Sequence, residues 1–325
     1  MSDLVKYDKS FIPNGQGLIN LGATCYFNSL LQCILSCPSI YKVLNDNIDK
    51  EHVKSNSLAM KLMLLWETAL KGESIYQICV PVWRDIIQIS QKQNNRIRMD
   101  NGQQDAHEGL MMFLDAMETI PEVQRLFKHR HRIQIMCEHC NSCVSDTRGE
   151  NFVFEVQADL KSEQIDKFKT VDEYYNTSMP LNEFLRKQNG YVDSNYACPK
   201  CGRKGEKFKT TTLTMIPEIL PVLIKKYGNK VLTPFPAKLE FLAKGGQKKY
   251  VYKLVAQSEH SGSMSGGHYW AIGLRQNGWM VLNDSNANPG NAGPTENTYI
   301  VFYHYFGEEN TNSTTTNTAN EEKTE

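Results

Sequence analysis

The chain has 325 residues, of which 40% are hydrophobic and 22% are charged, a composition typical of a globular protein with a sizeable core. Its 36 Lys and Arg residues balance its 36 Asp and Glu residues, so no overall field favours nucleic acid or an anionic membrane surface. Residues 1–6 lack an apolar signal region, and no stretch has the length of a membrane-spanning segment. These features predict a cytoplasmic or nuclear protein that binds neither nucleic acid nor membranes.

Apolar residues between about residues 17 and 125 recur with a helical period. They form three stripes: Phe27, Leu30, Leu31, Ile34 and Leu35; Leu58, Leu62, Leu65 and Trp66; and Leu110, Phe113, Leu114 and Met117. We therefore expect this third of the chain to be mostly helical. Pro38 should end the first of these helices, because proline lacks a backbone N–H group.

Beyond residue 130 the apolar residues alternate with a period of two, which indicates strands. The candidate strands lie at 152–160, 220–227, 250–256, 268–275, 279–283 and 298–306. The simplest arrangement is an antiparallel sheet, so the predicted fold class is α+β. Residues 307–325 are mostly Thr, Asn, Glu and Ser, and we expect them to form a disordered tail.

Cys25 lies where a glycine-containing loop enters the first predicted helix. Free backbone N–H groups and the positive end of a helix dipole lower the pKa of a thiol there, and they can also stabilise an oxyanion. The alternative is a buried structural thiol, which is also the interpretation of Cys33 and Cys37 on the same helix. Asn20 lies just upstream and can donate a second hydrogen bond to the oxyanion, although asparagine is also common in turns.

His268 begins a predicted strand after a flexible loop that includes Gly266 and Gly267. If residues 268–275 and 279–283 pair as a hairpin, Asn283 or Asp284 comes close to His268. A Cys-His-Asn/Asp triad follows, in which the third residue fixes the tautomer of the imidazole. The alternative is a structural histidine, and the coincidence of several compatible features weakens it.

Four of the nine cysteines form two Cys-x-x-Cys pairs, Cys137 with Cys140 and Cys198 with Cys201. An odd number of cysteines without a secretory signal argues against a disulfide framework. Four thiolates form a tetrahedral set for one zinc ion and leave no open position for catalysis. We therefore expect structural zinc and no organic cofactor. Nearby basic residues could instead indicate a nucleic-acid-binding ribbon, but the neutral net charge disfavours it.

These segments together resemble the ubiquitin-specific protease family, papain-like deubiquitinases whose catalytic domain is described as thumb, palm and fingers. Residues 17–32 look like the Cys box of the family, and residues 252–285 look like its His box. Residues 103–108 look like its Gln-Gln-Asp-Ala-His-Glu motif, and the paired cysteines match its zinc-bearing fingers.

The resemblance implies a papain-like α+β fold with a helical thumb, an antiparallel β palm and zinc-bearing β fingers. A single catalytic domain would span residues 17–306, after a lead-in at 1–16. The thumb would cover about 17–125, the fingers about 126–210 and the palm about 211–306.

The resemblance also implies residue roles by position. Cys25 would be the nucleophile, His268 the proton acceptor, Asn283 the third triad member, Asn20 the oxyanion donor and Asp284 an auxiliary orienter. Gln104 and Asp105 would contact the substrate, with Asp105 facing the basic C-terminal tail of ubiquitin. An acid that favours the start of its helix is the alternative for Asp105. Gly266 and Gly267 would line a narrow channel for a Gly-Gly tail.

The implied activity is hydrolysis of the bond after the C-terminal glycine of ubiquitin through a thioester on Cys25. Ubiquitin and ubiquitinated proteins would be the partners of a monomeric enzyme. Two alternatives stay open: a peptidase for another ubiquitin-like modifier, and a catalytically weak scaffold that binds ubiquitin.

Overall fold

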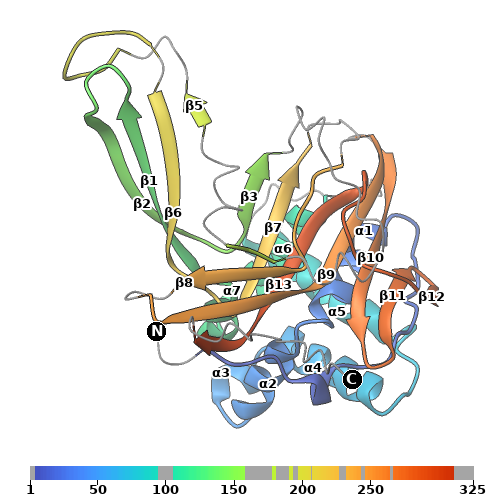
Figure 1. Cartoon of the computed structure of the whole chain (residues 1–325). Helices are drawn as coiled ribbons and strands as arrows, with labels where there is room; N and C mark the ends of the chain where they lie inside the picture. Colours follow the sequence, from blue (N-terminus) through green and yellow to red (C-terminus); the bar gives the residue numbers. More distant parts are fainter. Residues whose placement is uncertain are drawn as a thin grey trace, which may run out of the picture.

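The protein structure, a computed structural model, describes residues 4–93, 105–157, 178–180, 190–192, 197–205, 207–226, 232–242, 246–263 and 266–310. Within these ranges, helices occupy the first third of the chain and strands the remainder, as predicted (Figure 1). The helices are η1 (Lys9–Phe11), α1 (Cys25–Ile34), α2 (Pro38–Asp46), α3 (Glu51–Lys54), α4 (Ser57–Leu70), α5 (Cys79–Gln93), α6 (Ala106–Ala116) and α7 (Pro121–Phe127). The strands are β1 (His129–Cys137), β2 (Cys143–Asn151), β3 (Phe154–Gln157), β4 (Ser178–Pro180), β5 (Gly190–Val192), β6 (Lys207–Met215), β7 (Ile219–Lys225), β8 (Lys238–Leu242), β9 (Lys248–Ser263), β10 (Gly266–Arg275), β11 (Gly278–Asn283), β12 (Asn286–Pro289) and β13 (Thr298–Asn310).

The helices form where the sequence places apolar stripes and capping residues. The whole second stripe is buried on α4, and Asn56 caps this helix by accepting a hydrogen bond from Ala59 N over 2.9 Å. The prediction that Pro38 ends the first helix is wrong, because α1 already ends at Ile34 and Pro38 is the first residue of α2. Proline is favourable there, since the first N–H groups of a helix have no partner within the helix. No described helix is both long and apolar enough to cross a membrane.

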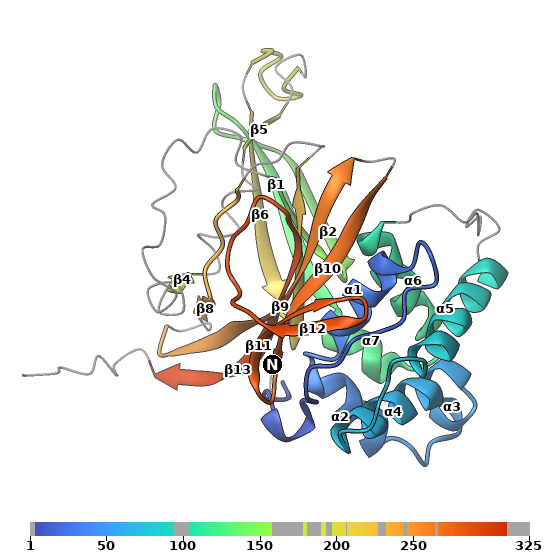
Figure 2. The same cartoon turned by 90° about the vertical axis from the view of Figure 1, so that its right-hand side faces the viewer.

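Two sheets organise the strands. The fingers sheet has the order β2-β1-β6-β5 and projects away from the body of the molecule (Figure 1). The palm sheet has the order β12-β11-β10-β9-β13-β7-β3, and β8 joins it through β9. The helices gather on one side of the palm (Figure 2).

Helix α1 connects the helices to the palm. It packs on β9 and β10 as well as on α6, and every one of its residues is buried. One of the two hydrophobic cores among the described residues therefore runs from the helices through α1 to the palm strands. Close packing of this kind leaves a residue on α1 little freedom to move relative to β10.

The structure departs from the expected strands in three places. The central palm strands are antiparallel as predicted, but β3 pairs with β7, and β4 with β8, in parallel. Strand β13 continues to Asn310, past the predicted start of the tail, and residues 311–325 lie outside the described residues. The lead-in packs against β13: Tyr7 N donates a hydrogen bond to Tyr305 O over 3.0 Å, and the Tyr7 ring stacks on Phe306.

Candidate active site

Cys25 is the first residue of α1, where the sequence predicts the nucleophile, and it is 2% exposed. The side chain of the preceding Thr24 does not cap the helix. Its hydroxyl instead accepts a hydrogen bond from Leu21 N over 3.0 Å. The first N–H groups of α1 therefore lack a side-chain cap and are available to a negative charge at this end of the helix.

The thiol of Cys25 is nevertheless less acidic than the sequence predicts. Burial raises its pKa above the ordinary value for cysteine, and the negative charge of Asp284 raises it further. The backbone N–H groups of Tyr269, Tyr26 and Cys25 itself lower the pKa without reversing the effect of burial. The expectation of a lowered pKa is therefore wrong for this structure, because desolvation outweighs the N–H groups.

The loop before Cys25 is tied to the turn after β11. Leu18 N donates a hydrogen bond to Asp284 O over 2.7 Å. Gly17 lies so close to this turn that a Cβ atom on it would meet Ser285 O at 2.1 Å, so only glycine fits there. Two segments that are far apart in the sequence are thereby held together beside Cys25.

His268 in β10 and Asn283 at the end of β11 lie on the predicted hairpin. His268 Nε2 is 2.7 Å from Asn283 Oδ1. Because a carbonyl oxygen can only accept, Nε2 carries the hydrogen and Nδ1 of the neutral ring is left to accept a proton. Asp284 is farther away, with Oδ2 at 4.0 Å from His268 Nε2. Asn283 is therefore the residue that orients the imidazole in this structure.

Two side-chain amides hold the carboxylate of Asp284. Asn20 Nδ2 donates to Oδ2 and Asn28 Nδ2 donates to Oδ1, each over 2.8 Å. Asn28 also donates to Ile19 O over 3.1 Å and is 3% exposed. Asn28 was not predicted from the sequence, although its position one helical turn after Cys25 places it on the same side of α1.

Cys25 lies beside the start of β10, which carries His268, but no hydrogen bond is described between the two side chains. The N–H of Tyr269, the residue after His268, faces the sulfur of Cys25. Among the described residues, no hydrogen bond joins the thiol to the imidazole, whose Nε2 is bound to Asn283. The imidazole is 43% exposed and stacks on Trp270. The structure thus brings the candidate nucleophile and base to one place and leaves them unpaired.

Asp105 is the N-cap of α6. Its Oδ1 accepts a hydrogen bond from His107 N over 2.6 Å, and its Oδ2 accepts one from the hydroxyl of Tyr299 over 2.5 Å. These contacts match the alternative interpretation of Asp105 as an acid that favours the start of its helix. Its contact with a substrate stays a prediction, and Gln104 lies outside the described residues.

Gly266 and Gly267, which the sequence predicts in a loop, instead form the start of β10, and their surroundings differ. A Cβ atom on Gly266 would meet nothing within 4 Å, whereas one on Gly267 would meet His260 Nε2 at 2.4 Å. The ring of His260 stacks on that of Tyr269 with centroids 4.3 Å apart. Burial lowers the pKa of His260, an effect that the charge of Asp105 opposes. His260 was not predicted from the sequence; it lies on β9, opposite Tyr269 on β10.

The four predicted zinc ligands come together at the fingers. Their Sγ atoms all lie within 4.8 Å of one another. The Sγ atoms of Cys137 and Cys201 are 3.9 Å apart, and those of Cys140 and Cys198 are 3.8 Å apart. Zn–S bonds of about 2.3 Å place the sulfurs of a tetrahedral site about 3.8 Å apart, so these residues fit zinc.

Both cysteine pairs turn in the same way, because the residue after the second cysteine, Asn141 or Gly202, has a positive φ.

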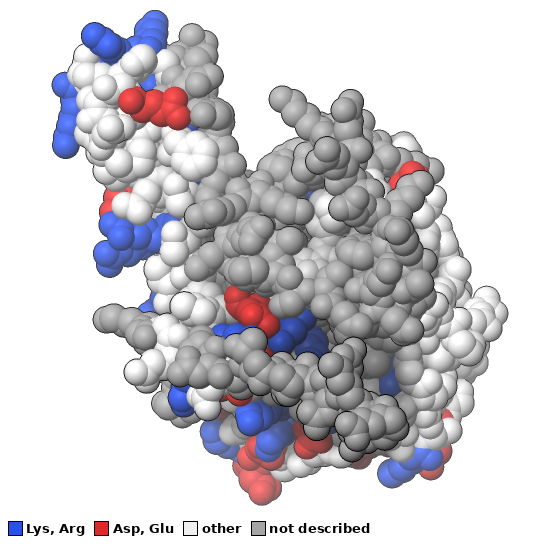
Figure 3. Space-filling view, in the orientation of Figure 1, with Lys and Arg blue, Asp and Glu red and all other residues white. Residues whose placement is uncertain are grey.

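The end of the fingers sheet carries several basic side chains (Figure 3). Lys200, Arg203 and Lys204 are exposed beside the second pair.

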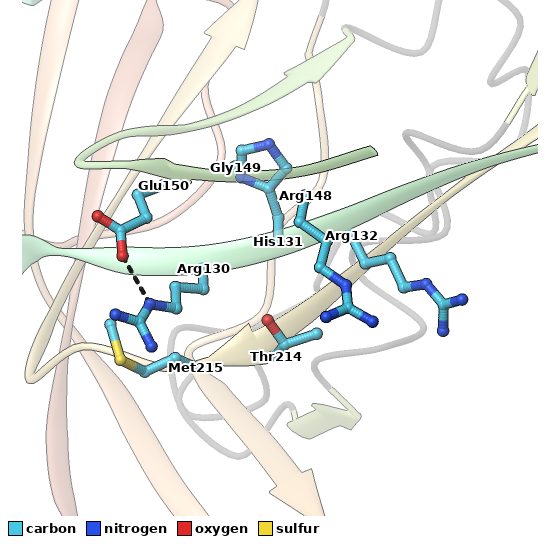
Figure 4. A pocket seen from close by; sticks show the side chains of 8 residues that line it. All are labelled: Arg130, His131, Arg132, Arg148, Gly149, Glu150, Thr214 and Met215. Carbon is cyan, nitrogen blue, oxygen red and sulfur yellow. Dashed lines mark hydrogen bonds and ion pairs between the residues drawn. The ribbon is translucent and has the colours of Figure 1, made fainter. Parts of the chain in front are cut away.

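A separate hollow of about 640 Å³ lies on the fingers sheet (Figure 4). It is lined by Arg130, His131, Arg132, Arg148, Gly149, Glu150, Thr214 and Met215. Two of its arginines have carboxylate partners: Arg130 Nε donates to Glu150 over 2.6 Å, and Arg132 Nε donates to Asp146 over 2.8 Å. None of the predicted catalytic residues lines this hollow.

Comparison with known proteins identifies the family. The family model described as ubiquitin carboxyl-terminal hydrolase matches residues 16–303. The chain belongs to this family. The resemblance read from the Cys and His boxes is therefore confirmed, and so is the papain-like fold with thumb, palm and fingers.

Curated ubiquitin carboxyl-terminal hydrolases match most of the chain at low identity. Ubiquitin carboxyl-terminal hydrolase 4 of Vanderwaltozyma polyspora is 24% identical over 361 residues, which cover 89% of this chain and 41% of the relative. The human ubiquitin carboxyl-terminal hydrolase 17-like protein 6 is 25% identical over 317 residues, which cover 89% of this chain and 74% of the relative. The chain thus spans less than half the length of the first of these hydrolases.

Solved structures of hydrolase complexes share the fold. The SAGA Ubp8/Sgf11/Sus1/Sgf73 DUB module bound to ubiquitin aldehyde matches with a TM-score of 0.64 and 18% identity, covering 92% of this chain and 71% of that chain. The yeast SAGA DUB module with a mutant Sgf73 matches with a TM-score of 0.66 and 19% identity, covering 93% and 71%.

Proposed function

We propose that the chain is a cysteine deubiquitinase that hydrolyses the peptide or isopeptide bond after the C-terminal glycine of ubiquitin. The observation that carries this proposal is the hydrogen bond of 2.7 Å between His268 Nε2 and Asn283 Oδ1, beside Cys25 at the start of α1. A ring held in this way presents Nδ1 as a base, and a thiol at a helix start faces N–H groups that favour an oxyanion.

The reaction begins with the thiol of Cys25. Because burial raises its pKa, the thiol needs His268 to take its proton as it attacks the glycine carbonyl carbon. His268 then gives the proton to the leaving lysine amine as the C–N bond breaks. The product is a thioester on Cys25. Water that loses a proton to His268 hydrolyses this thioester and releases ubiquitin with a free carboxylate.

Asn20 and the backbone N–H of Cys25 are the proposed oxyanion donors. Asn20 is fixed on both sides: Nδ2 donates to Asp284 over 2.8 Å, and Oδ1 accepts from Gly22 N over 2.9 Å. The other Nδ2 hydrogen makes no hydrogen bond among the described residues. Asp284 thus acts on the oxyanion side by holding Asn20, while Asn283 acts on the base. A donor fixed before the reaction does not need to reorganise when the charge forms.

Zinc is the proposed structural cofactor of the fingers. The four cysteine sulfurs are spaced for a tetrahedral site, and an ion there would fix the two turns that end the fingers sheet. A site with four thiolates has no position for substrate or water, so catalysis stays with Cys25.

A ubiquitin-binding scaffold with weak catalysis is the second candidate. The absence of a hydrogen bond between Cys25 and His268 and the raised pKa of the thiol favour it. Steady-state hydrolysis of a fluorogenic ubiquitin C-terminal substrate separates the two candidates. A deubiquitinase turns the substrate over, and its Cys25→Ala variant does not. If the protein is a scaffold, the wild type and the Cys25→Ala variant both bind ubiquitin, and neither releases the fluorophore.

The identity of the modifier is tested separately with probes built on ubiquitin and on other ubiquitin-like proteins. We expect the ubiquitin probe to react fastest. Reaction with another modifier alone would replace ubiquitin as the substrate and leave the chemistry of Cys25 unchanged.

A further inference from the structure

Arg275, the last residue of β10, is a buried cation. It is 3% exposed, and no carboxylate pairs with it in the described part of the chain. Burial lowers its pKa to about 10. A buried charge without a counter-ion is costly, so its neighbours must be arranged to receive it.

The hydrogen bonds of Arg275 converge on the far end of α1. Nη2 donates to Gln32 O over 2.8 Å and to Gln32 Oε1 over 2.6 Å. Nη1 donates to Ser36 Oγ over 2.6 Å and back to Leu274 O over 2.9 Å. The guanidinium therefore lies at the C-terminal end of the helix, where the helix dipole favours a positive charge.

Helix α1 and strand β10 run alongside each other and are joined at three points. At the first, Cys25 faces the N–H of Tyr269. At the second, Ser29 Oγ donates to Trp270 O over 2.9 Å. At the third, Arg275 binds Gln32.

The third contact needs a long side chain because the two elements advance at different rates. A helix rises about 1.5 Å per residue, so Gln32 is about 10 Å along α1 from Cys25. A strand rises about 3.3 Å per residue, so Arg275 is about 20 Å along β10 from Tyr269. The side chain reaches back along the strand, as its bond to Leu274 O shows.

We propose that Arg275 is a positioning residue: its guanidinium fastens the end of α1 to β10 and thereby sets where Cys25 lies relative to His268. The helix carries Cys25 at its start, and the strand carries His268 near its start. A contact at the far end of both elements fixes how they slide and turn against each other. The inference rests on the proposed function only in assigning a reaction to the two residues.

The primary test compares Arg275→Met with the wild type. The matched control is Arg84→Met, which changes an exposed arginine on α5. For Arg275→Met we expect kcat on a fluorogenic ubiquitin substrate to fall at least tenfold while KM changes less than twofold. We also expect iodoacetamide to alkylate Cys25 more slowly near neutral pH, and the rise of the alkylation rate with pH to shift to higher pH. Mass spectrometry follows the alkylation of Cys25. The kcat and the alkylation rate of Arg275→Lys should lie between those of the wild type and Arg275→Met. Lysine keeps the positive charge but lacks the forked guanidinium that donates from two nitrogens.

A second variant covers the case in which Arg275→Met does not fold. Gly273→Ala puts a methyl group 2.7 Å from Ser36 Oγ and 3.0 Å from Arg275 Nη1, so it wedges the contact open from the strand side. Gly273→Ala should show the loss of kcat and the change in Cys25 alkylation expected for Arg275→Met. The proposal is overturned if the folded variants keep the kcat and the alkylation profile of the wild type and only their melting temperatures fall.

Alkylation of Cys25 requires no ubiquitin, so the two proposals can fail separately. A wild-type protein that does not cleave ubiquitin but whose alkylation depends on Arg275 would refute the proposed function alone. A wild-type protein that cleaves ubiquitin and is indifferent to Arg275 in both readouts would refute the positioning role alone.

Discussion

Asn28 Nδ2 on α1 lies 2.8 Å from Oδ1 of Asp284 in the turn after β11. The bond joins the helix that begins at Cys25 to the turn that follows Asn283. Both residues are held from a second side, Asn28 by Ile19 O and Asp284 by Asn20. The geometry of the candidate site therefore depends on a partly buried polar network as well as on the candidate triad.

Replacing Asn28 with alanine should lower stability and activity together. The change leaves Ile19 O without its side-chain donor and Asp284 with one amide fewer, so we expect a loss of about 1–3 kcal/mol in the free energy of unfolding. Denaturant unfolding measures it. Asn47→Ala is the control, because among the described residues that amide donates only to Val43 O, on the helix that Asn47 follows as C-cap. Equal losses in the two variants would contradict the network.

Replacing Asn283 with alanine should reduce kcat by roughly 10²-fold with little effect on KM, because His268 loses the acceptor that holds its tautomer. Asn283→Asp should restore most of the rate, since a carboxylate can accept the same hydrogen bond. Steady-state kinetics on a fluorogenic ubiquitin substrate measures both. A full rate in Asn283→Ala would show that Asp284, at 4.0 Å, suffices as orienter.

Zinc should bind at one ion per chain. Atomic emission of the purified protein should find it, and Cys198→Ser should lose it, because a site with three thiolates binds zinc less tightly. Cys143→Ser is the matched control: Cys143 is exposed nearby and its Sγ donates to Ser145 O rather than joining the four sulfurs. Equal zinc content in both variants would rule out the predicted ligand set.

Glu218 should make stability fall as the pH rises. Burial raises its pKa from 4.5 to about 7, against the backbone N–H groups of Glu218 and Val5. Below pH 4.5 the carboxyl is protonated in both the folded and the unfolded chain. Between pH 4.5 and 7 unfolding lets this partly buried carboxyl release its proton, so the free energy of unfolding falls progressively, by about 3 kcal/mol in total.

Glu218→Gln has no such group, so the stability of the wild type relative to this variant should decrease between pH 4 and pH 8. Unfolding curves across this range measure the difference. A constant difference would mean that Glu218 has the same pKa in the folded and unfolded chains.

The sequence predicts the parts of this protein that depend on local spacing. Cys25 stands at a helix start, His268 and Asn283 lie on adjacent strands of a hairpin, and the cysteine pairs converge. Each of these follows from a short motif or from a periodicity of the apolar residues.

What the sequence does not predict depends on contacts between distant segments. Arg275 stands at a strand end, where an arginine is usually solvated, and only the packing of α1 against β10 buries it. The parallel pairing of β3 with β7 likewise depends on how the chain returns from the fingers to the palm. The pKa of Cys25 rises for the same reason, because the amount of burial at a helix start cannot be read from the motif.

The proposed function depends above all on attack by Cys25 on the C-terminal carbonyl of ubiquitin. The most direct measurement incubates the protein with ubiquitin that carries a C-terminal electrophile and maps the adduct by mass spectrometry. We predict one ubiquitin attached to Cys25, slower labelling in His268→Ala and none in Cys25→Ala. An adduct on another cysteine, or no adduct from a folded protein, would show that Cys25 is not the nucleophile of a deubiquitinase.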